Sequence, residues 1–283
     1  MPTPVVSVHP ITVPAPGRGT DLTVRVSAPT TGDHLPVVVF SHGFSQSATS
    51  YEPLAGYWAA HGFVVVQPTH LDSRTLGLAP DDPRTPDIHR IRVEDLVRSI
   101  DHLDALTAAV PGLAGRADTG SIAVAGHSWG AQTASVLLGA RTPDGRDRTD
   151  PRVARGVLLA ITGTGGADLS PFAAEHFPFM SPDFDAMKAP ALIVAGDHDQ
   201  SLLSVRGPDW FTDAYHLSPG PKTLLTLFGA EHSLGGISGY AAAETTDEHP
   251  ARVALVQRLT TAYLHGAADL EADPELGRIE QHG

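Results

Sequence analysis

The sequence contains no cysteine among its 283 residues. Disulfide bonds, metal sites built from thiolates and a cysteine nucleophile are therefore all excluded. Basic residues are also scarce, because 19 lysines and arginines face 32 aspartates and glutamates and leave a formal net charge of −13. Repulsion of this size opposes general binding to nucleic acid or to an anionic membrane, so we expect neither partner.

Long apolar runs are missing as well. No stretch approaches the ~20 apolar residues that a membrane-spanning helix needs, so we expect no membrane insertion. The first residues, Met1 to Pro4, lack the basic segment and apolar core of a secretory signal. The sequence therefore predicts a cytoplasmic protein, and secretion is compatible with it only if a signal was removed from this chain.

What the sequence does contain is a regular alternation of strand and helix patterns. Apolar runs predict eight strands, at 5–8, 22–27, 37–40, 63–66, 122–125, 156–161, 191–195 and 223–228. Helical patterns follow at 51–61, 88–106, 131–138, 209–216 and 248–265. Such alternation is typical of one α/β domain with a mostly parallel, eight-stranded sheet flanked by helices. We expect residues 1–283 to form that domain, with 267–283 as a polar, flexible tail.

Two segments are expected to have structural roles only. The helix over 88–106 has an apolar stripe, and its charged residues include Arg92, Asp95 and Asp104. We expect these charges to form a solvated face rather than part of a site. The segment 167–188 is too short for a separate cap domain, so we expect no large cap over the sheet.

One short stretch points to chemistry. The apolar run from Ile122 to Ala125 leads into Gly126-His127-Ser128-Trp129-Gly130, and a helical pattern follows. Strand, tight turn and helix form the context that a G-x-S-x-G nucleophile elbow requires. The two glycines remove side chains that would crowd the turn, and the amides at the helix start can stabilise an oxyanion. Ser128 is therefore the candidate nucleophile.

Other predicted strands are also followed by residues that could take part in catalysis. Phe44 follows the strand over 37–40, and His232 follows the last predicted strand. A serine nucleophile needs a base, which histidine provides because its pKa lies near neutrality, and a carboxylate to orient that base. Asp197 and Asp199 both follow the strand over 191–195 and compete for the carboxylate role. A metal site at Asp-His-Asp is the weaker interpretation, because no further ligand is in reach.

Several conspicuous residues are expected to be structural. His42 and His127 both lie within motifs, and we expect each to be a hydrogen-bonded residue beside a turn rather than a second base. Glu231 precedes His232 and is expected to face solvent. The glycine-rich stretch from Thr162 to Gly166 does not complete a dinucleotide-binding fingerprint, so we expect a loop there.

Taken together, His42-Gly43-Phe44, the elbow, Gly196-Asp197-His198-Asp199 and Gly229-Ala230-Glu231-His232 resemble the α/β-hydrolase superfamily. The nearest resemblance is to its chlorophyllase, dienelactone-hydrolase and cutinase-like polyester-hydrolase group, over about residues 5–265. This resemblance implies Ser128 as nucleophile, His232 as base and Asp199 as acid. It also implies an oxyanion hole formed by the backbone amides of Phe44 and Trp129.

The resemblance implies a serine hydrolase that cleaves carboxylic esters through an acyl-enzyme. We expect a small-molecule or polymeric ester substrate, no cofactor, no metal, and a monomer or homodimer. The same triad would serve a thioesterase, a lactonase or an acyltransferase. A non-catalytic binding protein of this fold is the rival from another class, and a peptidase would need a bulkier cap.

Overall fold

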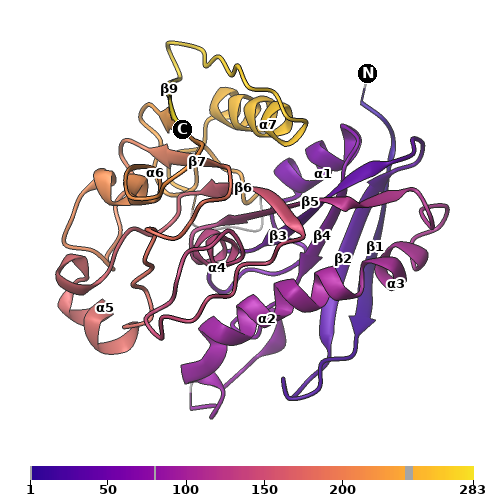
Figure 1. The fold of residues 1–283 in the computed structure, drawn as a ribbon, viewed down its shortest axis with the longest axis horizontal. Coiled ribbons are helices and arrows are strands. Elements are labelled where there is room, and N and C mark those ends of the chain that lie inside the picture. Colours follow the sequence, from indigo (N-terminus) through magenta and orange to yellow (C-terminus); the bar gives the residue numbers. More distant parts are fainter. Residues whose placement is uncertain (1, 80, 240–244) are drawn as a thin grey trace.

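A computed structural model of the chain describes residues 2–79, 81–239 and 245–283. Its strands form one sheet in the order β1-β2-β4-β3-β5-β6-β7-β8-β9 (Figure 1). Their bounds are β1 Val5–Val13, β2 Leu22–Pro29, β3 Leu35–Ser41, β4 Val64–Pro68, β5 Ala117–His127, β6 Val153–Leu159, β7 Ala191–Gly196, β8 Lys222–Leu227 and β9 Gly277–His282. The six central strands, β3 to β8, are all parallel, whereas β1, β2 and β9 pair antiparallel at the two ends.

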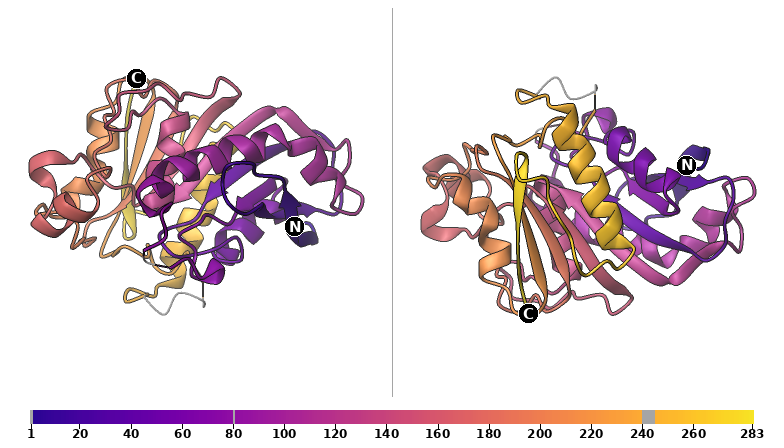
Figure 2. Two further views of the ribbon diagram at one scale, coloured as in Figure 1. Left: turned by 90° about the horizontal axis from the view of Figure 1, so that it is seen from below. Right: turned by 90° about the horizontal axis from the view of Figure 1, so that it is seen from above.

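Helices cover both faces of this sheet. Their bounds are α1 Glu52–Ala60, α2 Ile88–Asp101, α3 Leu103–Ala108, α4 Trp129–Leu137, α5 Pro171–His176, α6 Asp213–His216 and α7 Pro250–Leu264. Helices α1 and α7 lie together on one face, and α2 and α4 lie together on the other (Figures 1 and 2). Trp58 Nε1 donates to Thr260 Oγ1 at 3.0 Å and ties α1 to α7. None of the helices in the described part of the chain is long and apolar enough to cross a membrane.

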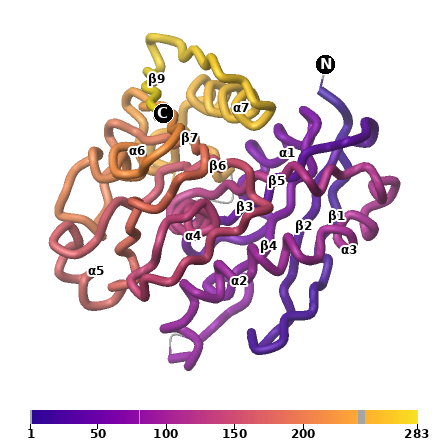
Figure 3. The backbone as a smooth tube through the Cα atoms, in the orientation of Figure 1, coloured from indigo at the N-terminus to yellow at the C-terminus, as the bar shows by residue number. Residues whose placement is uncertain are grey.

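The buried centre of the sheet follows from its composition. Strands β4 and β7 have no exposed residue, because each consists mainly of apolar side chains that meet helices on both faces. The edge strand β1 instead alternates between exposed and half-buried residues over most of its length. The backbone tube in Figure 3 places the indigo N-terminal strands and the orange C-terminal elements at opposite ends of the molecule, as the strand order requires.

The expectation of eight strands and a flexible tail over 267–283 is wrong. Residues 277–282 form a ninth strand, β9, which pairs with β8 in register from Lys222↔His282 to Leu227↔Gly277. Ile279 is its only large apolar residue, and the others are mostly exposed. A polar edge strand of this kind has no two-residue hydrophobic alternation, which is why its pattern is indistinguishable from that of a tail.

Two predicted helices are divided in the structure. The helix expected over 88–106 breaks at His102, whose φ and ψ of −109° and 17° are not helical and whose Nδ1 bonds the carbonyl of Arg98 at 2.9 Å. The helix expected over 209–216 is a 3₁₀ turn, Pro208–Thr212, followed by α6. Between β6 and β7 the chain forms only a 3₁₀ turn and the six-residue α5, so the sheet carries no large cap.

Candidate active site

Ser128, Asp199 and His232 follow strands β5, β7 and β8, and the structure brings their side chains together. The three strands are parallel, so their carboxyl ends lie at the same edge of the sheet. His232 Nε2 lies 2.9 Å from Ser128 Oγ, and His232 Nδ1 lies 2.9 Å from Asp199 Oδ2. With a proton on Nδ1, Nε2 is left as the acceptor for the serine hydroxyl.

The two aspartates after β7 have different partners. Asp199 is fully buried and contacts His232 through both carboxylate oxygens, at 2.9 and 3.1 Å. Asp197 is exposed, and its Oδ1 accepts the amide of Gly229 at 2.6 Å. The geometry therefore associates Asp199 with the histidine, whereas Asp197 stabilises a neighbouring turn.

The elbow around Ser128 depends on close backbone packing. Ser128 has φ 56° and ψ −125°, a conformation that few non-glycine residues adopt. A Cβ at Gly126 would lie 2.3 Å from the carbonyl oxygen of Gly130, and a Cβ at Gly130 would lie 2.0 Å from that of Ser41. Only glycine fits at either position, as the motif predicts.

The predicted oxyanion donors lie beside this elbow. Trp129 is the first residue of α4, where amides have no intrahelical partner. Phe44 follows β3 and is 58% exposed, and its ring centroid lies 5.9 Å from that of Trp129. Within the described ranges, neither amide donates a hydrogen bond to another protein group. Both amides are thus available to an oxygen atom bound at Ser128.

A cavity of about 310 Å³ opens at Ser128 and His232. Its other lining residues come from the loop after β3 and from the turns beside His232, namely Gly43, Phe44, Ser45, Gln46, Tyr51, Arg74, His127, Ser233 and Ser238. A second, more polar hollow of about 630 Å³ shares His232 and Ser233 with it and includes Asp197, His198 and Glu231. A bound substrate would therefore have room in two hollows that meet at the histidine.

His127 and Tyr51 connect the two halves of the site. The Tyr51 hydroxyl accepts the Gly43 amide at 3.1 Å and donates to His127 Nδ1 at 2.8 Å. His127 Nε2 then donates to the His232 carbonyl at 2.8 Å. Burial lowers the pKa of His127 to about 3, so the ring is neutral. His127 is a hydrogen-bonded structural residue, whereas no sequence signal identifies Tyr51, which only begins a helical pattern.

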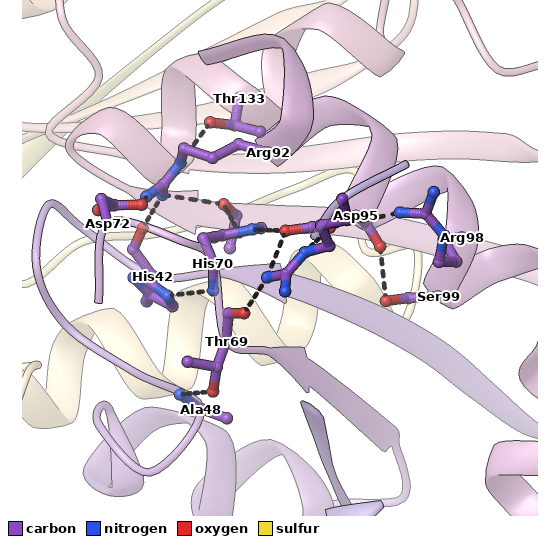
Figure 4. Close-up of polar contacts among 12 residues, drawn as sticks. His42, Ala48, Thr69, His70, Asp72, Arg92, Asp95, Arg98, Ser99 and Thr133 are labelled. Carbon is purple, nitrogen blue, oxygen red and sulfur yellow. Dashed lines mark hydrogen bonds and ion pairs between the residues drawn. The ribbon is translucent and has the colours of Figure 1, made fainter. Parts of the chain in front are cut away.

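The expected solvated face of α2 is wrong for two of its three named charges. Asp104 is exposed, but Arg92 and Asp95 have fully buried side chains. Arg92 pairs with Asp72, and Asp95 contacts His70, as Figure 4 shows. Asp95 also pairs with Arg18. Because these partners are distant in the sequence, no local pattern indicates the pairing. The sequence alone therefore predicts that such charges face solvent.

The histidines and carboxylates of the described residues do not gather into a metal-binding cluster. No group of three histidine, aspartate or glutamate side chains in residues 2–79, 81–239 and 245–283 is arranged to hold a metal ion. The nitrogens of His42 are both engaged, with Nδ1 donating to the Gly43 carbonyl and Nε2 accepting the His70 amide.

The order of the strands and the helices on both faces define an α/β-hydrolase fold. A family model described as Chlorophyllase matches residues 6–144, a segment that includes Ser128 and ends before Asp199. No curated protein matches the chain.

Among solved structures, one described as a Pyrobaculum calidifontis esterase in a monoclinic form is similar at a TM-score of 0.63 and 22% identity. That alignment covers 94% of this chain and 87% of the esterase. A second structure, a hyperthermophilic esterase from the same archaeon, has a TM-score of 0.57 at 22% identity, with 92% and 84% covered. At this level of identity the likeness concerns the fold.

Proposed function

We propose that the protein is a serine hydrolase that cleaves carboxylic esters. The observation that carries this proposal is the hydrogen-bonded row of Ser128, His232 and Asp199, with 2.9 Å contacts on both sides of the imidazole. Further support comes from the similarity to solved structures described as esterases and to the Chlorophyllase family model.

In this proposal Ser128 Oγ attacks the ester carbonyl while its proton passes to His232 Nε2. Asp199 stabilises the imidazolium, and the amides of Phe44 and Trp129 bind the negative oxygen of the tetrahedral intermediate. When the intermediate collapses, His232 returns the proton to the departing alcohol and leaves an acyl-serine. Water, activated by the same histidine, then attacks the acyl carbonyl and releases the acid.

The substrate is proposed to be a small-molecule or polymeric ester. Support comes from the small segment between β6 and β7, which leaves the site without a large cap, and from the exposed ring of Phe44 at the cavity. The same groups can process thioesters and lactones, so both belong in the substrate panel. Steady-state hydrolysis of p-nitrophenyl esters from acetate to decanoate would also measure the length of the acyl site.

The test compares the wild type with Ser128→Ala. We expect the variant to lose at least about 1,000-fold in turnover, because the nucleophile is removed. Ser121→Ala is a matched control, since Ser121 is an exposed serine on the same strand, β5, and should leave turnover unchanged. Wild-type turnover in Ser128→Ala, or no turnover of any ester or thioester by the folded wild type, would overturn the proposal.

A further inference from the structure

A buried ion pair lies directly behind the predicted oxyanion hole. Arg92, on α2, and Asp72, in the segment after β4, have side chains that are 0% and 3% exposed. Arg92 Nη1 lies 2.6 Å from Asp72 Oδ1 (Figure 4). The proposed reaction gives neither side chain a chemical role, because both are shielded from the cavity at Ser128.

This pair holds the backbone on both sides of Phe44. Arg92 Nη2 donates to the carbonyl of His42, two residues before Phe44. Asp72 Oδ2 accepts the amide of Ser45, the residue after Phe44, at 2.9 Å. One ion pair thus fixes a carbonyl and an amide that flank the Phe44 amide, and so determines where that amide points.

The same guanidinium also contacts the second predicted donor. Its central carbon lies 4.6 Å from the ring centroid of Trp129. Arg92 Nε donates to Thr133 Oγ1 at 3.2 Å, and that hydroxyl donates to the Trp129 carbonyl at 2.8 Å. Arg92 therefore contacts both segments that carry the amides of the oxyanion hole, one on the loop after β3 and one on α4.

The pair is ionised. Burial opposes the charge on Asp72, but the charge of Arg92 and the hydrogen bonds from Ser45 and Arg92 outweigh it and keep the pKa of Asp72 below its usual value. A buried ion pair often adds little net stability compared with apolar residues of similar volume. Its directional hydrogen bonds do fix geometry, and oxyanion stabilisation depends on donors that are positioned before the reaction begins.

We propose that Arg92 and Asp72 are positioning residues that set the distance and orientation of the Phe44 and Trp129 amides. This inference rests on the proposed ester hydrolysis at Ser128. Removing the guanidinium leaves the binding cavity and the nucleophile in place but loosens the two donors. The effect is therefore expected in the transition state, where the oxygen is negative, rather than in substrate binding.

The experiment uses Arg92→Met, Arg92→Lys and the matched control Arg18→Met. Arg18 is also a buried arginine in an ion pair, 2.8 Å from Asp95 in the same network, but it contacts neither the loop after β3 nor α4. Four quantities are measured for each folded variant: kcat and KM for p-nitrophenyl butyrate, the inhibition constant of phenylboronic acid, and Tm. Phenylboronic acid forms an anionic tetrahedral adduct with serine, so its affinity reports on the oxyanion hole.

We expect Arg92→Met to lower kcat by about 10- to 100-fold with KM within about twofold, because displaced donors weaken transition-state binding. The affinity for phenylboronic acid should fall by a similar factor. Arg92→Lys should recover part of kcat, since it keeps a charge beside Asp72 without the planar fork. Arg18→Met should lower Tm but keep the wild-type kcat.

A kcat of Arg92→Met equal to that of Arg18→Met, at comparable loss of Tm, would overturn the positioning role. If Arg92→Met does not fold, the same quantities measured for Asp72→Asn test the positioning role. This variant keeps the shape of the Asp72 side chain and one acceptor oxygen while removing its charge. An active wild type with unaffected variants would reject only the positioning role. A wild type indistinguishable from Ser128→Ala would reject the proposed function itself.

Discussion

At the residue scale, the site is built around a serine in a strained backbone conformation and a histidine that bridges two loops. Ser128 keeps its φ of 56° because Gly126 and Gly130 let strand, turn and helix approach closely. His127, the residue before it, then links Tyr51 to the carbonyl of His232. The nucleophile, the loop after β3 and the predicted base therefore share one hydrogen-bonded chain.

Tyr51→Phe tests this chain. The change removes the hydroxyl that the Gly43 amide donates to and that donates to His127, and each buried partner left unsatisfied costs about 1–3 kcal/mol. We expect a lower Tm and a turnover about 3- to 30-fold below that of the wild type, because the loop and His232 lose their link. Thermal denaturation and ester hydrolysis measure the two effects.

Tyr57→Phe is the matched control for this prediction. Tyr57 lies on α1, and its ring stacks on His61 at a centroid distance of 3.9 Å, away from Ser128. It should keep turnover and Tm close to the wild-type values. Equal behaviour of the Tyr51 and Tyr57 variants would show that the hydrogen-bonded chain contributes nothing to the site.

The role of a residue can be predicted from the sequence when its neighbours in the chain require that residue. It cannot be predicted when all of its partners are distant in the sequence. Gly126 and Gly130 are predictable because the turn itself requires them. Arg92 and Tyr51 are not, since Arg92 meets the loop after β3 and Thr133, and Tyr51 meets His127, 76 residues along the chain. For the same reason, the sequence predicts that Asp95 faces solvent, although Asp95 is paired with Arg18 in the structure.

At the element scale, β9 protects the last parallel strand. All six residues of β8 are buried, and β9 pairs along its full length. His282 Nε2 also donates to the Tyr215 carbonyl at 2.9 Å and ties the end of β9 to α6. β8 leads into the turn that carries His232. Pairing with β9 therefore stabilises the strand on which the position of His232 depends.

Removing residues 277–283 should therefore expose an edge that is otherwise paired. We expect Tm to fall by at least about 5 °C, and we expect self-association through the open edge of β8. Glu280→Ala is the control, because it removes only the surface ion pair with Arg278, which has little effect on stability. A truncated chain with unchanged Tm and an unchanged size-exclusion profile would contradict the role given to β9.

Elements with strong apolar patterns are predictable to within a few residues. The eight central and N-terminal strands and α7 lie where their periodicity indicates, because burial on one or both faces imposes that periodicity. The break at His102 and the strand β9 depend instead on packing against elements far away in the sequence. A polar edge strand and a tail differ only in whether a neighbouring strand is present to pair with.

At the scale of the whole molecule, several buried histidines couple stability to pH. Burial lowers the pKa of His42 to about 4 and that of His127 to about 3, and it lowers the pKa of His70 well below its usual value. The unfolded chain binds protons at these rings near pH 6.5, whereas the folded chain does not. The free energy of unfolding therefore falls as the pH drops from about 6.5 towards 4.

One buried carboxyl opposes this trend. Burial raises the pKa of Asp95 to about 6, so the folded chain takes up one proton that the unfolded chain binds only near pH 4. The three histidines lose stability and Asp95 gains it as the pH falls, so these four groups together lower the free energy of unfolding by roughly 3 kcal/mol per pH unit. Tm measured from pH 7 to 4.5 should fall steeply. Exposed His198→Gln should keep that slope, and a flat Tm would contradict the account.

The central claim, that Ser128 is an activated nucleophile, is tested most directly by a fluorophosphonate. The wild type and Ser128→Ala are each incubated with the probe, and intact mass and peptide mapping locate the adduct. The account predicts one adduct per chain, on Ser128, and none on the folded variant. A folded wild type that takes up no probe, or that carries the adduct on another residue, would contradict it.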